Sequence, residues 1–287
     1  MIASRPKKYG SLLKSSSPLP GFRLSLGFTV AYLTAVVLIP LVAILLRAVH
    51  NGRAAFWSAI TSPRVEASYR VTLTSAVAAA LLSALLGMLI AWVLARYRFP
   101  GKRLVDALID LPFALPTAVA GIALTSLYSE HGWIGRHLEP HHIHVVFTQL
   151  GIILAMTFVG LPFVVRSVQP VLAEIDKSIE EAARSLGARP WHIVVRILLP
   201  VSLPALVTGT ALAFARGVGE YGSVIFIAGN MPMKTEIASL LIVTKLEEYD
   251  YEGAAAIAVA MLALSCIVML GLNLLQWRLQ RREGKRA

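Results

Sequence analysis

Charged residues and cysteine are both scarce in this sequence. Charged residues make up 15% of its 287 residues, against about 25% in an ordinary soluble domain. Cys266 is the only cysteine, which excludes an internal disulfide, a cysteine-based metal site and a redox dithiol. A nucleotide-binding loop of the G-x-x-x-x-G-K-S/T type is absent, so we expect no ATPase activity or other catalysis from this chain. Hydrophobic residues, by contrast, reach 56%, a proportion that indicates a membrane protein.

The hydrophobic residues gather in runs that approach or exceed the length of about 20 residues needed to cross a bilayer as a helix. We predict an all-α membrane protein of about six transmembrane helices, from runs at residues 24–46, 71–95, 111–129, 145–165, 200–228 and 253–277. Proline interrupts the third run, and charged residues interrupt the fifth. The predicted domain organisation is a tail at 1–23, a membrane domain at 24–277 and a second tail at 278–287.

The net charge of +11 follows membrane topology rather than nucleic-acid binding. Lys and Arg lie at the ends of the apolar runs and form no single patch with interleaved aromatic residues. The two tails and the loops after the second and fourth runs carry 19 of them, whereas the loops of the opposite side carry 7. Because basic residues accumulate on the cytoplasmic side, we predict a multi-pass protein with both termini in the cytoplasm.

The cytoplasmic loop at about residues 167–199 is amphipathic. Apolar residues from Ile179 to Leu186 recur at helical spacing, and Gly187 follows at the position where a helix ends in a left-handed turn. Pro190 suits the first turn of a second short helix that reaches the fifth run. Two short helices joined by a glycine turn predict a compact protruding knob to which a soluble partner protein can bind. The alternative is an amphipathic helix lying on the membrane surface.

The same loop resembles the E-A-A-x3-G-x9-I-x-L-P loop of bacterial ABC importer permeases. The matching residues are Glu181, Ala182, Ala183, Gly187, Ile197, Leu199 and Pro200. In that family the loop is the coupling helix, which docks in a cleft of the ATPase subunit. The resemblance implies a role in ATPase coupling for Glu181, Ala182, Ala183, Gly187, Ile197 and Pro200.

Further segments narrow the resemblance to the T subunit of sulfate/thiosulfate permeases, at residues 97–101, 110–121, 162–172 and 219–230. Molybdate permeases share the general style, so molybdate or another tetrahedral oxyanion is the alternative substrate. The resemblance implies a bacterial inner-membrane permease that works by alternating access. It also implies a second permease (the W subunit), two ATPase subunits that use ATP and magnesium, and a periplasmic binding protein. The resemblance therefore implies that this chain itself binds no cofactor.

Two features inside the runs are candidates for the substrate path. Pro112 and Pro116 remove backbone donors, and such breaks survive in a membrane where they face protein or a water-filled cavity. Together with Thr117 they form either a wall of the path or a packing kink without substrate contact. Arg216 and Glu220, four residues apart, share one helix face and can pair. They form either a structural contact or a charged gate in the path of the anion.

The segment at residues 130–144 is rich in histidine, with His131, His137, His141, His142 and His144. Histidine is a common metal ligand, but the spacing matches no closed zinc pattern, and we expect a solvated loop without metal. A membrane-embedded enzyme is the alternative of another class. It would need a nucleophile, an acid–base pair or a metal at one depth, and the histidines have no such partner in the sequence pattern.

Overall fold

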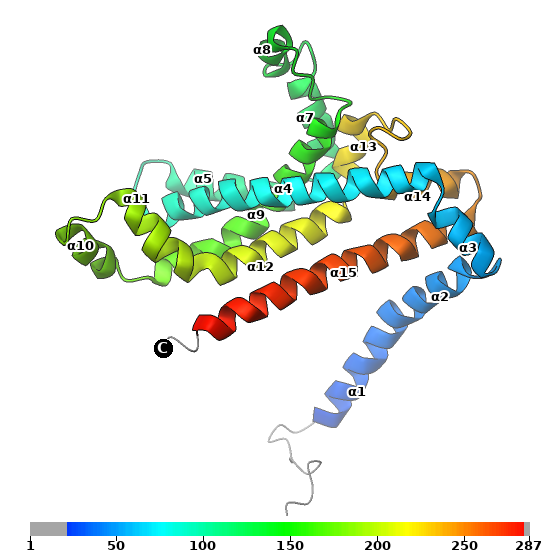
Figure 1. The fold of residues 1–287 in the computed structure, drawn as a ribbon, viewed down its shortest axis with the longest axis horizontal. Coiled ribbons are helices and arrows are strands. Elements are labelled where there is room, and N and C mark those ends of the chain that lie inside the picture. The colour runs from blue at the N-terminus through cyan, green and yellow to red at the C-terminus, as the bar shows by residue number, and fades with distance from the viewer. Residues whose placement is uncertain (1–21, 284–287) are drawn as a thin grey trace, which may run out of the picture. The chain divides into compact units, whose positions relative to one another are not determined.

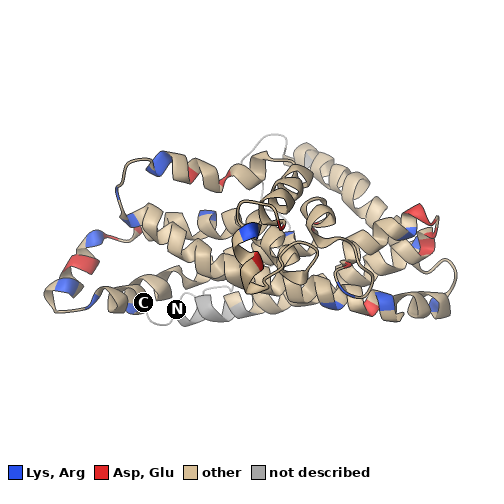
Figure 2. Ribbon diagram, turned by 90° about the horizontal axis from the view of Figure 1, so that it is seen from above, with Lys and Arg blue, Asp and Glu red and all other residues tan. Residues whose placement is uncertain are grey.

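The computed structural model describes residues 22–283, and every regular element in that range is a helix, which confirms the all-α fold. Helical segments long and apolar enough to cross a membrane span Leu24–Ala48, Pro63–Arg96, Gln149–Glu174, Pro190–Val218 and Tyr251–Leu274. These correspond to the first, second, fourth, fifth and sixth predicted runs. Figure 2 shows most of the Lys, Arg, Asp and Glu residues toward the ends of the long helices, whose middle sections are almost free of them.

Residues 22–46 belong to one compact unit, and residues 47–283 belong to a second. The first unit consists of α1 (Phe22–Leu33), a π-helical turn η1 (Thr34–Leu38) and most of α2 (Ile39–Ala48). The π turn lies just before Pro40, whose missing N–H interrupts the α-helical ladder, and the wider turn absorbs the interruption. The first predicted run is therefore one continuous helical span with a local widening.

The second unit begins with α3 (Arg53–Ile60) and centres on α4 (Pro63–Arg96), α9 (Gln149–Glu174) and α12 (Leu199–Val218), which pack directly on one another (Figure 1). Small residues permit the close approach. A Cβ atom at Gly209 of α12 would lie 2.8 Å from the Cα of Val164 in α9. Contacts of this kind are typical of membrane helices, which must associate by close packing because lipid offers no hydrophobic driving force.

Hydrogen bonds fix the relative direction of α4 and α9. Gln149, the first residue of α9, donates through Nε2 to Thr74 Oγ1 (2.8 Å) and Ser75 Oγ (3.2 Å) of α4. Arg96, the last residue of α4, donates through Nη2 to the carbonyl oxygen of Ile175, just beyond α9 (3.1 Å). The two helices are therefore parallel, and the chain between them has to return to the starting side.

This return is where the sequence-based prediction of a single third span is wrong. The run at 111–129 is divided into α6 (Leu111–Ala114) and α7 (Thr117–Tyr128), and another short helix, α5 (Lys102–Ile109), precedes it. A helix of 12 residues, as in α7, is about 18 Å long, too short to cross the roughly 30 Å of hydrocarbon alone. Between the end of α4 and the start of α9 the chain must travel back from the level of Arg96 to that of Ser75, which is about 32 Å along α4. Because Pro112 and Pro116 cannot continue a helical ladder, several short helices make this crossing.

The fifth predicted run is also divided, and the break lies where the charged residues Arg216 and Glu220 interrupt it. α11 (Pro190–Ile193), a π turn η3 (Val194–Leu198) and α12 form one helical segment, so the predicted second short helix of the loop is the beginning of the span. The π turn lies just before Pro200, as η1 lies before Pro40. The helix ends at Val218, and the chain resumes as α13 (Gly222–Ala228), which packs against α7.

The remaining elements complete the two ends of the unit. α8 (Gly135–Leu138) and a 3-10 turn η2 (Glu139–His141) lie between α7 and α9, and α10 (Lys177–Ser185) lies between α9 and α11. α14 (Ala238–Glu247) and α15 (Tyr251–Glu283) pack together as a helical hairpin. Tyr69 near the start of α4 donates to the carbonyl of Ile257 near the start of α15 (3.4 Å), so α15 runs in the direction of α4 toward the end that carries α10.

Candidate functional site

The predicted coupling helix is α10, and both of its ends are capped. The backbone N–H of Ser178 donates to Asp176 Oδ1 (2.9 Å), which satisfies a free donor of the first turn and lowers the pKa of Asp176 below its ordinary value. At the other end Gly187 has φ +84°, which confirms the predicted left-handed turn. Its N–H donates to the carbonyl of Arg184 (2.9 Å), and the N–H of Ala188 donates to that of Ala183 (3.0 Å), the two bonds of a Schellman motif.

The surface of this knob is partly apolar. Glu181 and Ala182 are exposed, as the docking prediction requires. Two large apolar side chains of the same helix and its C-cap are exposed as well: Ile179 (48%) and Leu186 (90%). Ile179 and Leu186 belong to the apolar stripe that the sequence predicted, and both side chains face outward. Apolar side chains presented on a charged loop are suited to contact with a partner protein.

The other two predicted coupling residues lie where the knob joins the fifth span. Ile197 is half-buried and packs against the cluster of buried residues that contains Leu172 and Leu198. Pro200 is exposed in the first turn of α12, directly after the π turn. The motif therefore combines a surface part, around Glu181 and Gly187, with a packing part that joins the knob to the fifth span.

A buried ion pair that the sequence analysis missed anchors α10. Arg96 Nε lies 2.6 Å from Glu180 Oε1, and the side chains are 7% and 9% exposed. The two atoms are close but not aligned as a hydrogen bond, so the contact is an ion pair. Arg184, 62% exposed, lies 3.7 Å from the second oxygen of Glu180. The only signal in the sequence is that Glu180 precedes the motif glutamate, and nothing in the pattern says which of the two faces inward.

The candidate path residues of the third and fifth runs meet where α7 crosses α13. Pro116 is the N-cap of α7, and Thr117 follows it. A Cβ atom at Gly222, the first residue of α13, would lie 2.2 Å from Thr117 Oγ1, so only glycine allows the two helix starts to come this close. Pro112 belongs to the first turn of α6, before the break. The structure thus brings Pro116 and Thr117, but not Pro112, against the start of α13.

Arg216 and Glu220 form an ion pair beside this crossing, with Arg216 Nη1 2.6 Å from Glu220 Oε2. The side chain of Glu220 is 1% exposed, whereas that of Arg216 is 33% exposed. The other carboxylate oxygen, Oε1, accepts hydrogen bonds from the N–H (2.9 Å) and the Oγ (2.8 Å) of Ser223 in α13. Ser239 donates to the carbonyl oxygen of Glu220 (2.7 Å). Glu220 therefore holds the start of α13 in place, while the guanidinium of Arg216 stays partly accessible.

A second arginine, Arg166 of α9, binds two aspartates in the segment of short helices that follows α4. It donates through Nε and Nη2 to both carboxylate oxygens of Asp110 (2.8 and 2.6 Å) and through Nη1 to Asp106 Oδ1 (2.8 Å). Arg166 Nη1 also donates to Gln169 Oε1 (2.9 Å). Bidentate pairing of this kind is among the stronger and more directional side-chain contacts. Asp110 and Arg166 lie in segments that carry the family resemblance, but nothing in the sequence predicts that they contact each other.

Known proteins resemble this chain over most of its length. Residues 83–282 match the family model of the binding-protein-dependent transport system inner membrane component. The sulfate transport system permease protein CysT of Escherichia coli (strain K12) is 49% identical over 270 residues, which cover 94% of this chain and 98% of that protein. Its namesake in Synechocystis sp. is 47% identical over 86% of this chain and 87% of that protein. Among solved structures, a bacterial ABC transporter involved in the import of alginate matches with a TM-score of 0.75 at 16% identity, over 89% of this chain and 94% of that chain.

Proposed function

The chain belongs to the family of binding-protein-dependent transport system inner membrane components, and we infer from this that it is the permease subunit of an ATP-driven importer of sulfate. The observation that carries the inference is the 49% identity to a protein named as a sulfate permease, because it extends over 94% of this chain. A match of this extent covers the loops as well as the membrane spans. Sulfate is therefore a better supported substrate than molybdate.

The proposed complex contains a second, homologous permease (the W subunit), two ATPase subunits and a periplasmic binding protein. ATP and magnesium are used by the ATPase subunits, and this chain has no catalytic role. One solved relative in fold, with a TM-score of 0.74, is a bacterial alginate ABC transporter in complex with a pentasaccharide-bound periplasmic protein. In the present chain the exposed apolar residues Ile179 and Leu186 support docking of a soluble partner on α10.

The contacts of α10 suggest how movement of an ATPase reaches the spans. When two ATPase subunits close on ATP, a docked α10 is displaced. Arg96 and Glu180 connect α10 to the end of α4, and the continuous helix from Pro190 to Val218 connects the knob to the fifth span. α4, α9 and α12 pack too closely to bend independently. We therefore expect them to move as one body, which opens the path alternately toward the two faces.

The path itself is proposed to run by the crossing of α7 and α13. There a partly exposed guanidinium, that of Arg216, is available to a divalent anion, and Glu220 limits how strongly it attracts that anion. The same location is consistent with a purely structural pair, and the variants described in the Discussion separate the two roles. The orientation proposed for the subunit places α10 and both termini in the cytoplasm, in the inner membrane of a bacterium.

Uptake of labelled sulfate tests the function. The chain is co-expressed with the proposed second permease and ATPase, reconstituted into proteoliposomes with ATP inside, and supplied with the binding protein outside. We expect sulfate uptake that requires ATP and that excess unlabelled sulfate or thiosulfate suppresses more strongly than molybdate does. Stronger suppression by molybdate would reassign the substrate, and a chain that brings down no ATPase and supports no flux would overturn the permease assignment.

A further inference from the structure

The histidine-rich segment between α7 and α9 is folded into a compact loop rather than an extended solvated one. It contains α8 and the 3-10 turn η2, and Phe147 at its end donates to the carbonyl of Ile227 in α13 (2.7 Å). The histidines do not behave alike within it. His137 Nδ1 lies 2.9 Å from the carbonyl oxygen of Trp133, a contact inside its own helix turn. His144 instead turns toward acidic side chains.

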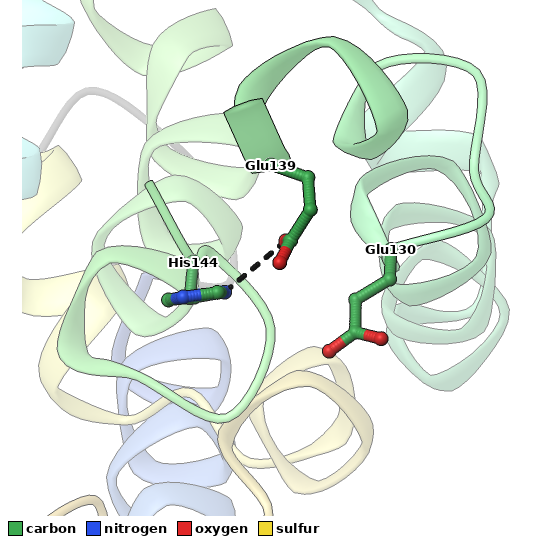
Figure 3. A group of neighbouring side chains, drawn as sticks. All are labelled: Glu130, Glu139 and His144. Atoms are coloured by element: carbon green, nitrogen blue, oxygen red, sulfur yellow. Dashed lines mark ion pairs between the residues drawn. The ribbon is translucent and has the colours of Figure 1, made fainter. Parts of the chain in front are cut away.

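Three potential metal ligands converge from separate points of this loop: Glu130, Glu139 and His144 (Figure 3). One ligand atom of each lies within 4.8 Å of those of the other two. His144 Nδ1 and Glu139 Oε2 are already 3.3 Å apart. The three side chains, together with His131, line a cavity of about 320 Å³ that is open to solvent. Glu139 and His144 are about half exposed, at 44% and 51%, so an ion has free access to them.

The charges of the group are not balanced by the protein. Glu130 and Glu139 bring two carboxylates together, and a single imidazole can supply at most one positive charge. Within residues 22–283, no Lys or Arg forms an ion pair with either carboxylate. Like charges held this close repel each other unless a cation lies between them. A divalent cation would neutralise both carboxylates.

The distances also fit a metal ion. Ligand atoms about 2.1 Å from a tetrahedral metal are about 3.4 Å from one another. The 3.3 Å separation between His144 Nδ1 and Glu139 Oε2 meets this requirement as it stands. Glu130, within 4.8 Å, has to approach by little more than 1 Å. That movement is within the reach of an exposed glutamate side chain, which changes rotamer freely.

We propose that Glu130, Glu139 and His144 bind one divalent transition-metal ion, and that Zn²⁺ is the ion that this donor set suits. One imidazole nitrogen with two carboxylate oxygens is a combination that zinc accepts, with water or His131 in the fourth position. Calcium and magnesium prefer sets made of oxygen alone. Binding would close the loop between its beginning at Glu130 and its end at His144. It would thereby stabilise the connection between α7, α13 and α9, and it needs no assumption about the transported solute.

Zinc content and zinc affinity of the purified full-length chain test the site. The protein is prepared in detergent with an affinity tag that contains no histidine, stripped with EDTA and desalted. Bound Zn²⁺ is counted by mass spectrometry, its affinity is measured by titration calorimetry, and the midpoint of thermal unfolding is recorded with and without Zn²⁺. Glu130→Gln and His144→Gln each remove one ligand from exposed positions and should not disturb folding, which gel filtration verifies. His137→Gln and His142→Gln are the matched controls, because they remove histidines of the same loop that lie outside the group.

We expect one zinc ion per wild-type chain, with an unfolding midpoint that rises when zinc is added. Loss of a direct ligand should weaken binding by at least the roughly tenfold that loss of a second-shell contact costs. Glu130→Gln and His144→Gln should therefore lose the bound zinc and the thermal shift, while the two controls keep both. Mg²⁺ and Ca²⁺ should not shift the wild-type midpoint. Wild-type affinity in both ligand variants, loss of zinc in the controls, or no zinc uptake by the wild type would each overturn the proposal.

Discussion

Arg96, the last residue of α4, and Glu180, within α10, lie 2.6 Å apart between Nε and Oε1, and each side chain is more than nine-tenths buried. The same guanidinium donates to the carbonyl of Ile175, where the chain leaves α9 (3.1 Å). One side chain therefore connects α4, the end of α9 and α10. If α10 couples to an ATPase, as proposed, we expect its displacement to reach two spans through this charged contact.

Removal of Arg96 tests this connection. Arg96→Ala leaves the carboxylate of Glu180 buried without its principal partner, which should destabilise the subunit by about 3 kcal/mol. We expect a lower unfolding midpoint and less ATPase recovered with the complex. Arg184→Ala is the control: Arg184 contacts the same carboxylate at 3.7 Å but is 62% exposed, so its loss should cost less than about 1 kcal/mol. Equal effects of the two changes would mean that Arg96 and Glu180 do not anchor α10.

Gly187 tests the turn of the coupling loop without changing any contact. A Cβ atom there would meet nothing within 4 Å, so the only penalty of a side chain is the left-handed backbone at φ +84°. Gly187→Val should cost about 2 kcal/mol, distort the turn after α10 and lower both ATPase copurification and uptake. Gly187→Asn is the matched control, because asparagine tolerates this conformation. A valine variant that couples as well as the asparagine variant would contradict the assignment.

Reversal of the charge at Glu181 tests the surface part of the motif. Glu181 is exposed, so Glu181→Lys should leave the subunit folded and inserted. We expect weaker recovery of the ATPase and reduced uptake, because the substitution reverses the charge of this chain's proposed docking surface. Glu66→Lys, an exposed change outside the loop, controls for the effect of charge alone. ATPase recovery equal to that of the control would remove Glu181 from the docking surface.

Arg216 and Glu220 are expected to respond unequally to substitution. Arg216→Ala leaves a carboxylate that is 1% exposed without its cation, and assembly should suffer by about 3 kcal/mol. Glu220→Gln leaves Arg216, a third exposed, to water, and the amide oxygen can still accept from Ser223. We therefore expect the glutamine variant to assemble but to retain the anion longer, which slows uptake while ATP hydrolysis continues.

The double variant Arg216→Gln with Glu220→Gln separates a gate from a structural pair. It removes both charges and should recover assembly in either case. A gate predicts that uptake stays low because the path has lost its cation. Recovery of uptake together with assembly would show that the pair only supports packing. Assembly, ATPase rate and sulfate uptake are measured on the same preparations.

Reporter fusions test the topology and the composite third crossing. A reporter that is active only in the periplasm should be active after His144 and inactive after Arg103 and at the C-terminus. The reason is that α4 and α9 run parallel, so residues 97–148 must cross once although none of their helices is long enough alone. Equal activity after Arg103 and after His144 would place α5–α7 on one side of the membrane and refute the crossing.

The overall class and the docking loop could be predicted from the sequence because their signals are local. Apolar runs of about 20 residues identify spans without knowledge of their neighbours, and five of the six appear as long helices. Gly187 could be placed in a left-handed turn because the residues before it have a helical pattern that stops there. Pairing of Arg216 with Glu220 was predicted from their spacing of four residues, although α12 ends at Val218 and Glu220 lies just beyond it.

What the tertiary structure alone decided concerns residues that are far apart in the chain. The sequence showed that prolines interrupt the third apolar run. Only the parallel direction of α4 and α9 shows that several short helices must together cross the membrane once. Glu180 and Glu181 are neighbours with the same chemistry, and the approach of Arg96 selects Glu180 as the buried one. The histidine spacing gave no metal pattern, because Glu130, Glu139 and His144 converge through the folding of their loop. The spacing of residues along the sequence predicts which of them share a helix face. The partner of a charged group, however, depends on which segments the tertiary packing brings together.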